Sequence, residues 1–101
     1  MNITMPLRYQ PLAPVRRVAE PGLPIRLALG RALRRLRAAA GYSEEQLGAR
    51  AGVSPVQVAR LERGEERVSL VMLEHLARSL GMEVSELVRE AEREQRPGSA
   101  P

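Results

Sequence analysis

Apolar residues recur along the middle of the chain with the spacing of one helix face. The first series advances by three or four residues at a time, which is typical of an amphipathic helix. It comprises Leu29, Leu33, Leu36 and Ala40. The pattern predicts a helix over about 25–40, followed by Gly41, where a left-handed C-terminal cap is expected.

Three shorter helices are predicted from their start signals. Ser43 with Gln46 forms a capping box, and Ser54 before Pro55 combines an N-cap with proline at the first helical position. Ser69 caps the next helix. The three predicted helices cover about 43–51, 54–63 and 69–80, and they end at Gly52, Gly64 and Gly81.

A last helix is predicted over about 84–94. Its apolar face comprises Val84, Leu87, Val88 and Ala91. The fold class is therefore all-α, with five helices forming one compact domain over residues 25–94. We expect residues 95–101, which include two prolines, to be a disordered tail.

Residues 1–24 contain five prolines, which exclude a continuous helix. Ile3, Met5, Leu7 and Tyr9 alternate with other residues, which is a strand pattern, although Pro6 would confine such a strand to a sheet edge. Two interpretations stay open for this extension: a disordered arm or a short edge strand.

Composition limits the possible chemistry. The 101 residues contain no cysteine and one histidine, His75, which excludes disulfides and thiolate metal sites and disfavours an imidazole cluster. No acid pair or phosphate-binding glycine loop is present, so we predict no catalytic residue, no metal and no cofactor. No apolar run is long enough to cross a membrane, and we expect a cytoplasmic protein.

Charge is distributed unevenly. Residues 1–42 carry a net charge of +7, whereas residues 43–101 carry −3. A sequence pI near 10.9 favours a polyanion as partner.

Five segments together resemble the Cro/repressor-type helix-turn-helix proteins, also called the XRE or lambda-repressor-like family. Between Leu29 and Leu87 they read L-G-R-A-L-R-R-L-R, G-Y-S-E-E-Q-L, A-G-V-S-P-V-Q-V-A-R-L-E-R-G, S-L-V-M-L-E-H-L-A-R-S-L-G and S-E-L. The resemblance implies sequence-specific binding of double-stranded DNA by a bacterial or phage transcriptional regulator, acting as a repressor. Helix 54–63 would enter the major groove.

The resemblance also implies which residues contact DNA. Arg60 is the strong polar reader, most naturally bidentate to guanine, while Val56 and Ala59 suit a thymine methyl. The base contacts are Pro55, Val56, Ala59 and Arg60. The backbone contacts are Ser43, Glu45, Ser54, Gln57, Arg63 and Arg67.

A structural ion pair between Arg37 and Glu62 is implied in the same way. The apolar seam beside it would comprise Leu47, Ala51, Val53, Val58 and Leu61. Gly48 replaces the alanine that is more common in the family, and glycine within a helix costs about 1 kcal/mol relative to alanine. We therefore expect this helix to be somewhat weakened.

Three glutamates depart from the family pattern, because they would repel phosphate near the recognition helix. They are Glu44, Glu65 and Glu66. Compensating positive charge is available from Arg31, Arg34 and Arg35 in the first helix, or from Arg16 and Arg17 in the extension.

The expected partners are double-stranded DNA and a second copy of the chain. Val68, Val71 and Met72 would either form an exposed apolar dimer surface or pack inward. The alternative function is an antitoxin or co-regulator that binds DNA weakly and a partner protein through residues 1–24.

Overall fold

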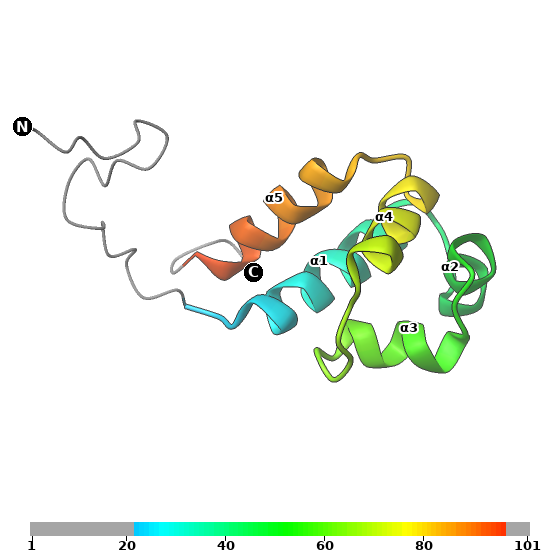
Figure 1. The fold of residues 1–101 in the computed structure, drawn as a ribbon, viewed down its shortest axis with the longest axis horizontal. Coiled ribbons are helices and arrows are strands. Elements are labelled where there is room, and N and C mark those ends of the chain that lie inside the picture. The colour runs from blue at the N-terminus through cyan, green and yellow to red at the C-terminus, as the bar shows by residue number, and fades with distance from the viewer. Residues whose placement is uncertain (1–21, 97–101) are drawn as a thin grey trace, which may run out of the picture.

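The structure, a computed structural model, describes residues 22–96. This part of the chain contains five helices and no strand, which confirms the predicted all-α fold (Figure 1). Their bounds are α1 Ile25–Ala39, α2 Glu44–Ala51, α3 Pro55–Glu62, α4 Leu70–Ser79 and α5 Val84–Gln95. The predictions for residues 1–21 and 97–101 lie outside the described residues.

Local capping explains where the central helices begin. The Ser43 hydroxyl accepts a hydrogen bond from the Gln46 backbone N–H (3.0 Å), and Gln46 Oε1 accepts one from the Ser43 N–H (2.8 Å). Ser54 and Gln57 form the same reciprocal pair at the start of α3. Each helix begins one residue after its serine because the cap itself has extended dihedral angles.

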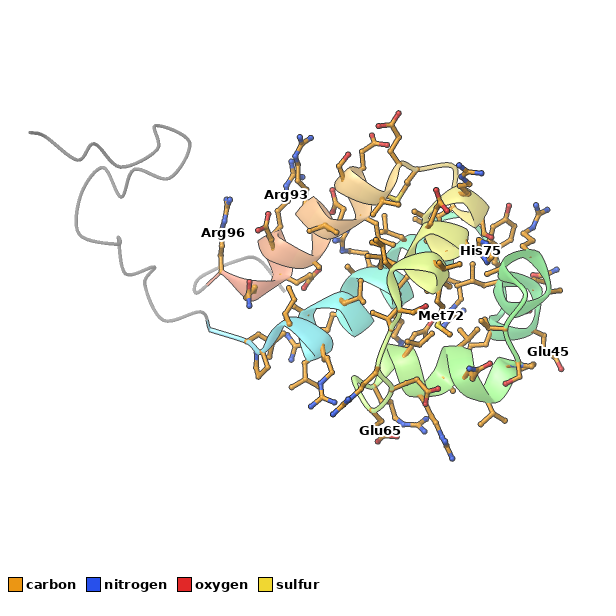
Figure 2. All side chains as sticks on the ribbon, in the orientation of Figure 1. Glu45, Glu65, Met72, His75, Arg93 and Arg96 are labelled. Carbon is orange, nitrogen blue, oxygen red and sulfur yellow. The ribbon has the colours of Figure 1, made fainter. Side chains whose placement is uncertain are left out.

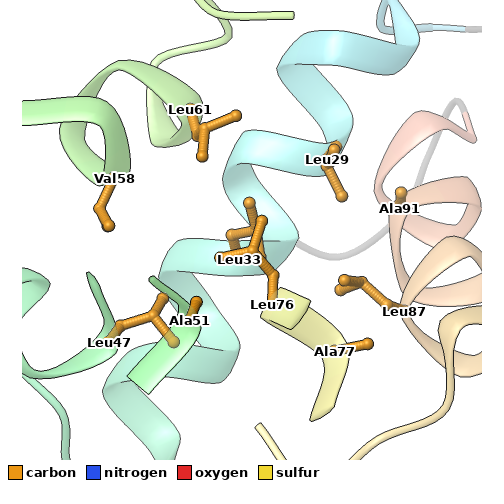
Figure 3. Close-up of a cluster of buried hydrophobic side chains, with 10 residues drawn as sticks. All are labelled: Leu29, Leu33, Leu47, Ala51, Val58, Leu61, Leu76, Ala77, Leu87 and Ala91. Atoms are coloured by element: carbon orange, nitrogen blue, oxygen red, sulfur yellow. The ribbon is translucent and has the colours of Figure 1, made fainter. Parts of the chain in front are cut away.

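The core lies between α1 and the other four helices. Figure 3 shows Leu33 and Leu76 near its centre, with Val58 and Leu61 of α3 on one side and Leu87 on the other. The predicted seam is buried except Val53, which is half-buried. The buried cluster comprises Leu29, Leu33, Leu47, Ala51, Val58, Leu61, Leu76, Ala77, Leu87 and Ala91.

Two predicted core positions are wrong. Ala40 is exposed because it follows the last residue of α1 as its C-cap. Val88 is 37% exposed, whereas Leu87 and Ala91 are buried in the core and Val84 packs against it. The apolar face of α5 is thus narrower than its sequence pattern suggests.

Two glycines allow backbones to approach closely. A Cβ atom on Gly48 would lie 2.5 Å from the Val53 carbonyl oxygen, so alanine does not fit without displacing the turn between α2 and α3. Besides its cost in helix propensity, Gly48 therefore allows a close approach that a side chain would prevent. A Cβ on Gly30 would collide with the carbonyl oxygens of Leu61 and Glu62, which places the backbone of α3 directly against α1.

Helix α5 packs along α1 and runs in the opposite direction (Figure 1). Arg35 joins them through Glu90 (2.8 Å) and Glu94 (2.9 Å), and hydrogen bonding to Glu90 raises the pKa of the Arg35 guanidinium despite some desolvation. This contradicts the suggestion that Arg35 supplies free positive charge. Arg31 and Arg34 are exposed.

Candidate nucleic-acid interface

The face of α3 that points away from the core contains the residues predicted to contact bases. Pro55, Val56 and Arg60 are exposed, and Val56 is 62% exposed although it is apolar. Ala59 is half-buried beside them. Because Val58 and Leu61 are buried on the opposite side, the structure brings the four predicted residues together on one outward face.

The inner side of α3 is tied to α1 by an ion pair. The Arg37 guanidinium donates from Nη2 to Glu62 Oε1 (3.0 Å) and from Nε to Glu62 Oε2, while Nη1 donates to the Tyr42 carbonyl oxygen (2.9 Å). Only 15% of the Arg37 side chain and 4% of the Glu62 side chain are exposed. The bidentate contact between Arg37 and Glu62 fixes the end of α3 to the end of α1.

Electrostatics at this pair favour the charged arginine. The hydrogen bond to Glu62 raises the pKa of the Arg37 guanidinium against an opposing effect of desolvation, and the charges of Glu62 and Glu44 add to the increase. Glu44 is half-buried. Part of its negative charge therefore acts on Arg37, so Glu44 does more than the phosphate repulsion that the sequence suggested.

Two arginines, Arg60 of α3 and its C-cap Arg63, have acidic neighbours in the loop that follows the helix. Arg63 Nη2 lies 3.2 Å from Glu65 Oε1, and Arg60 Nη1 lies 4.0 Å from Glu66 Oε1. Gln57 Nε2 also donates to Glu66 Oε2 over 3.4 Å. The sequence marked both glutamates as unusual, but these contacts depend on how the loop turns back toward α3.

The residues predicted to contact the DNA backbone come from α3, its caps, the start of α2 and the loop after α3. Ser43 and Ser54 are exposed helix caps whose hydroxyl oxygens accept backbone N–H groups, which leaves each hydroxyl hydrogen to donate. Glu45 is exposed in the first turn of α2, and Figure 2 shows it and Glu65 toward opposite ends of α3. The positions Gln57, Arg63 and Arg67 complete the set, and the two arginines are exposed.

The start of α4 carries an exposed apolar pair. Leu70 is 73% exposed and Val71 is 61% exposed. Val68 and Met72, in contrast, are half-buried against the core. Each of the two alternatives therefore describes part of this segment. Val71 is exposed, as an apolar surface requires, whereas Val68 and Met72 pack inward.

The described residues contain no group of three or more histidine, cysteine or acidic side chains placed to hold a metal ion. His75 lies exposed on α4, where its carbonyl oxygen accepts a hydrogen bond from the Ser79 hydroxyl (2.7 Å). Within residues 22–96, no helix has the length and apolar character needed to span a membrane.

A family model for the helix-turn-helix domain matches residues 28–91. The chain belongs to this helix-turn-helix family. The match includes all five helices except the ends of α1 and α5, and it confirms the predicted resemblance. It also agrees with the prediction that the chain is not an enzyme.

Solved structures support the same assignment. The clp gene regulator ClgR from Corynebacterium glutamicum is 38% identical, with a TM-score of 0.66 over 70% of this chain and 76% of that one. A second ClgR structure is 36% identical, with a TM-score of 0.69 over 74% and 96% of the two chains.

The restriction-modification controller protein C.AhdI from Aeromonas hydrophila is also similar. It is 41% identical, with a TM-score of 0.59 over 60% of this chain and 92% of that one. A comparison with curated proteins gave no match.

Proposed function

We propose that this protein is a transcriptional regulator that binds specific sequences of double-stranded DNA and acts as a repressor. The observation that carries the proposal is the outward face of α3, where Pro55, Val56 and Arg60 are exposed on a helix held from behind by Arg37 and Glu62. A helix presented in this way fits the major groove. The similarity to the clp gene regulator ClgR and to the controller protein C.AhdI supports it.

In the proposed complex, α3 reads bases and the surrounding residues contact phosphates. Arg60 donates to guanine, and Val56 and Ala59 contact thymine methyl groups beside Pro55. The phosphate contacts come from Ser43, Ser54, Gln57, Arg63, Arg67 and the backbone at Glu45, where the N-terminal turn of α2 presents unpaired amides.

We propose that the chain acts as a homodimer in the cytoplasm, with Leu70 and Val71 at the contact between copies. These two apolar side chains are adjacent and largely exposed, and covering them would remove apolar area from water. Two copies would place their α3 helices in successive major grooves of a palindromic site.

Selection of bound duplexes from a random DNA library tests the DNA-binding proposal, with the oligomeric state measured by light scattering. We expect a defined, two-fold symmetric motif. Arg60→Ala should weaken binding to it by about 1–3 kcal/mol and relax one base position in each half-site. Arg67→Ala should weaken binding to all duplexes about equally. Equal binding of every duplex and of an unrelated polyanion at low salt contradicts the proposal.

A second candidate function is that of an antitoxin or co-regulator. It is favoured by the glutamates beside Arg60 and Arg63, which lower the positive charge of the outer face of α3. Residues 1–24 would then bind a partner protein. Affinity capture with the full chain and with a form lacking residues 1–21 separates the two candidates. The second function requires a partner protein that the full chain captures and the shorter form does not.

A further inference from the structure

Glu66 lies beside two residues of the proposed DNA interface, the phosphate contact Gln57 and the base contact Arg60. Its Oε2 accepts from Gln57 Nε2 over 3.4 Å, and its Oε1 lies 4.0 Å from Arg60 Nη1. Gln57 is itself held at the start of α3, where its Oε1 accepts from the Ser54 N–H (3.2 Å). A continuous chain of polar contacts therefore runs along the outer side of α3.

The contact leaves Arg60 able to read a base. A guanidinium carries five N–H donors, and the two acceptors on the major-groove edge of guanine use two of them. Glu66 approaches one terminal nitrogen at 4.0 Å, and 56% of the Arg60 side chain remains exposed. Glu66 can thus remain beside Arg60 while the rest of the guanidinium meets the base.

Burial distinguishes Glu66 from its neighbour. The Glu66 side chain is 24% exposed, whereas that of Glu65 is 56% exposed and is paired with Arg63, outside the proposed base contacts. A carboxylate that is largely covered and touches two contact residues restricts where they point. A long arginine side chain that is restricted in advance loses less freedom when it binds.

We propose that Glu66 is a positioning residue for sequence specificity, which holds Arg60 toward the base edge and away from the phosphates. The inference rests on the proposed DNA-binding function. Without Glu66, Arg60 swings to the nearest phosphate on any duplex. Random sequences then gain affinity while the preferred base loses its advantage.

Binding measurements on the full chain test this with E66Q and with E65Q as a matched control. Both variants remove one negative charge from the same loop, so both should bind a random duplex about two- to fivefold more tightly. The base position read by Arg60 is the one at which R60A loses its preference. Only E66Q should also reduce the ratio of affinities for the preferred and the other bases at this position, by about two- to fivefold.

Two further variants separate positioning from charge. E66D keeps the charge but shortens the reach, so it should reduce the base preference while tightening binding to random duplexes less than E66Q does. In an R60A background, E66Q should leave the remaining base preferences unchanged, because it acts through Arg60. Thermal unfolding of each variant verifies that the fold is intact.

A wild-type chain that prefers no duplex contradicts the proposed function itself. The positioning role alone is overturned by a clear preference that R60A does not relax, by equal base preferences in E66Q and E65Q, or by an E66Q effect that persists in R60A.

Discussion

The inner and outer sides of α3 carry ion pairs of different kinds. On the inner side, the Arg37 guanidinium donates hydrogen bonds to both carboxylate oxygens of Glu62 and to a backbone carbonyl oxygen. Little of either side chain is exposed. On the outer side, Arg60 and Arg63 each have a single acidic partner, and both arginine side chains are more than half exposed. The inner contacts therefore fix α3 to the rest of the domain, whereas the outer arginines stay accessible to a ligand.

Burial explains the difference in energy. An exposed pair contributes about 0–1 kcal/mol, because water and salt compensate for its loss. Removing one partner of a buried pair leaves a charge without compensation and costs several times more.

Glu62→Ala should reduce the free energy of unfolding by about 3–5 kcal/mol, because it strands the Arg37 guanidinium among buried groups. Thermal denaturation followed by circular dichroism measures this loss. Glu90→Ala is the matched control, since it removes a glutamate from the more exposed pair with Arg35 and should cost about 1 kcal/mol or less. Equal melting temperatures for Glu62→Ala and the wild type would mean that the buried ion pair does not stabilise the fold more than the exposed ones.

Gly30→Ala should destabilise the domain by about 1–3 kcal/mol through overpacking, although alanine is the better helix former. The added methyl group would collide with the backbone of α3 on its inner side. Denaturant titration measures the change. Ala38→Gly at an exposed site of α1 provides the control for propensity and should cost about 1 kcal/mol or less. A gain in stability from Gly30→Ala would mean that α1 and α3 are not in backbone contact.

Ser54→Ala should cost about 1 kcal/mol, because it removes the hydroxyl that accepts the Gln57 N–H at the start of α3. This contact lies on the exposed side, so the loss should fall between those of the inner and outer ion pairs. Urea unfolding of Ser54→Ala and of Ser43→Ala, which removes the equivalent cap of α2, should give similar values. A loss as large as that of Glu62→Ala would mean that an exposed helix cap stabilises the domain as much as the buried ion pair.

Glu65→Gln should change the free energy of unfolding by less than about 0.5 kcal/mol, since its pair with Arg63 is exposed on both sides. The same denaturation assay detects whether the outer contacts contribute more than this. A substantial loss would show that the front of α3 also depends on its ion pairs.

Much of the fold could be predicted because its signals are local. Ser43, Ser54 and Ser69 accept hydrogen bonds from the backbone three residues later, so serine and its neighbours predict each helix start within a residue. The apolar spacing likewise predicted that Leu33 and Leu47 are buried. Val58 and Leu61, which belong to the predicted apolar seam, are also buried, and the DNA contacts on the opposite face were implied by the family resemblance.

The remaining features depend on contacts between distant segments. Nothing near Gly30 in the sequence indicates that α3 lies against it, and glycine alone suggests only a weaker helix. The partners of Arg35 are more than fifty residues away along the chain. The position of Glu66 depends on the path of a loop that has no periodic pattern.

The hydrogen bond from the Gly22 N–H to the Gln95 carbonyl oxygen (2.9 Å) brings both ends of the described chain together. In Figure 1 they meet at the opposite end of the molecule from α2. A fluorophore, surface tether or covalent linker attached near either residue would therefore leave the first turn of α2 unobstructed. Two domains could also be joined in tandem as one polypeptide, so that duplex recognition by a linked pair can be measured without any assembly step.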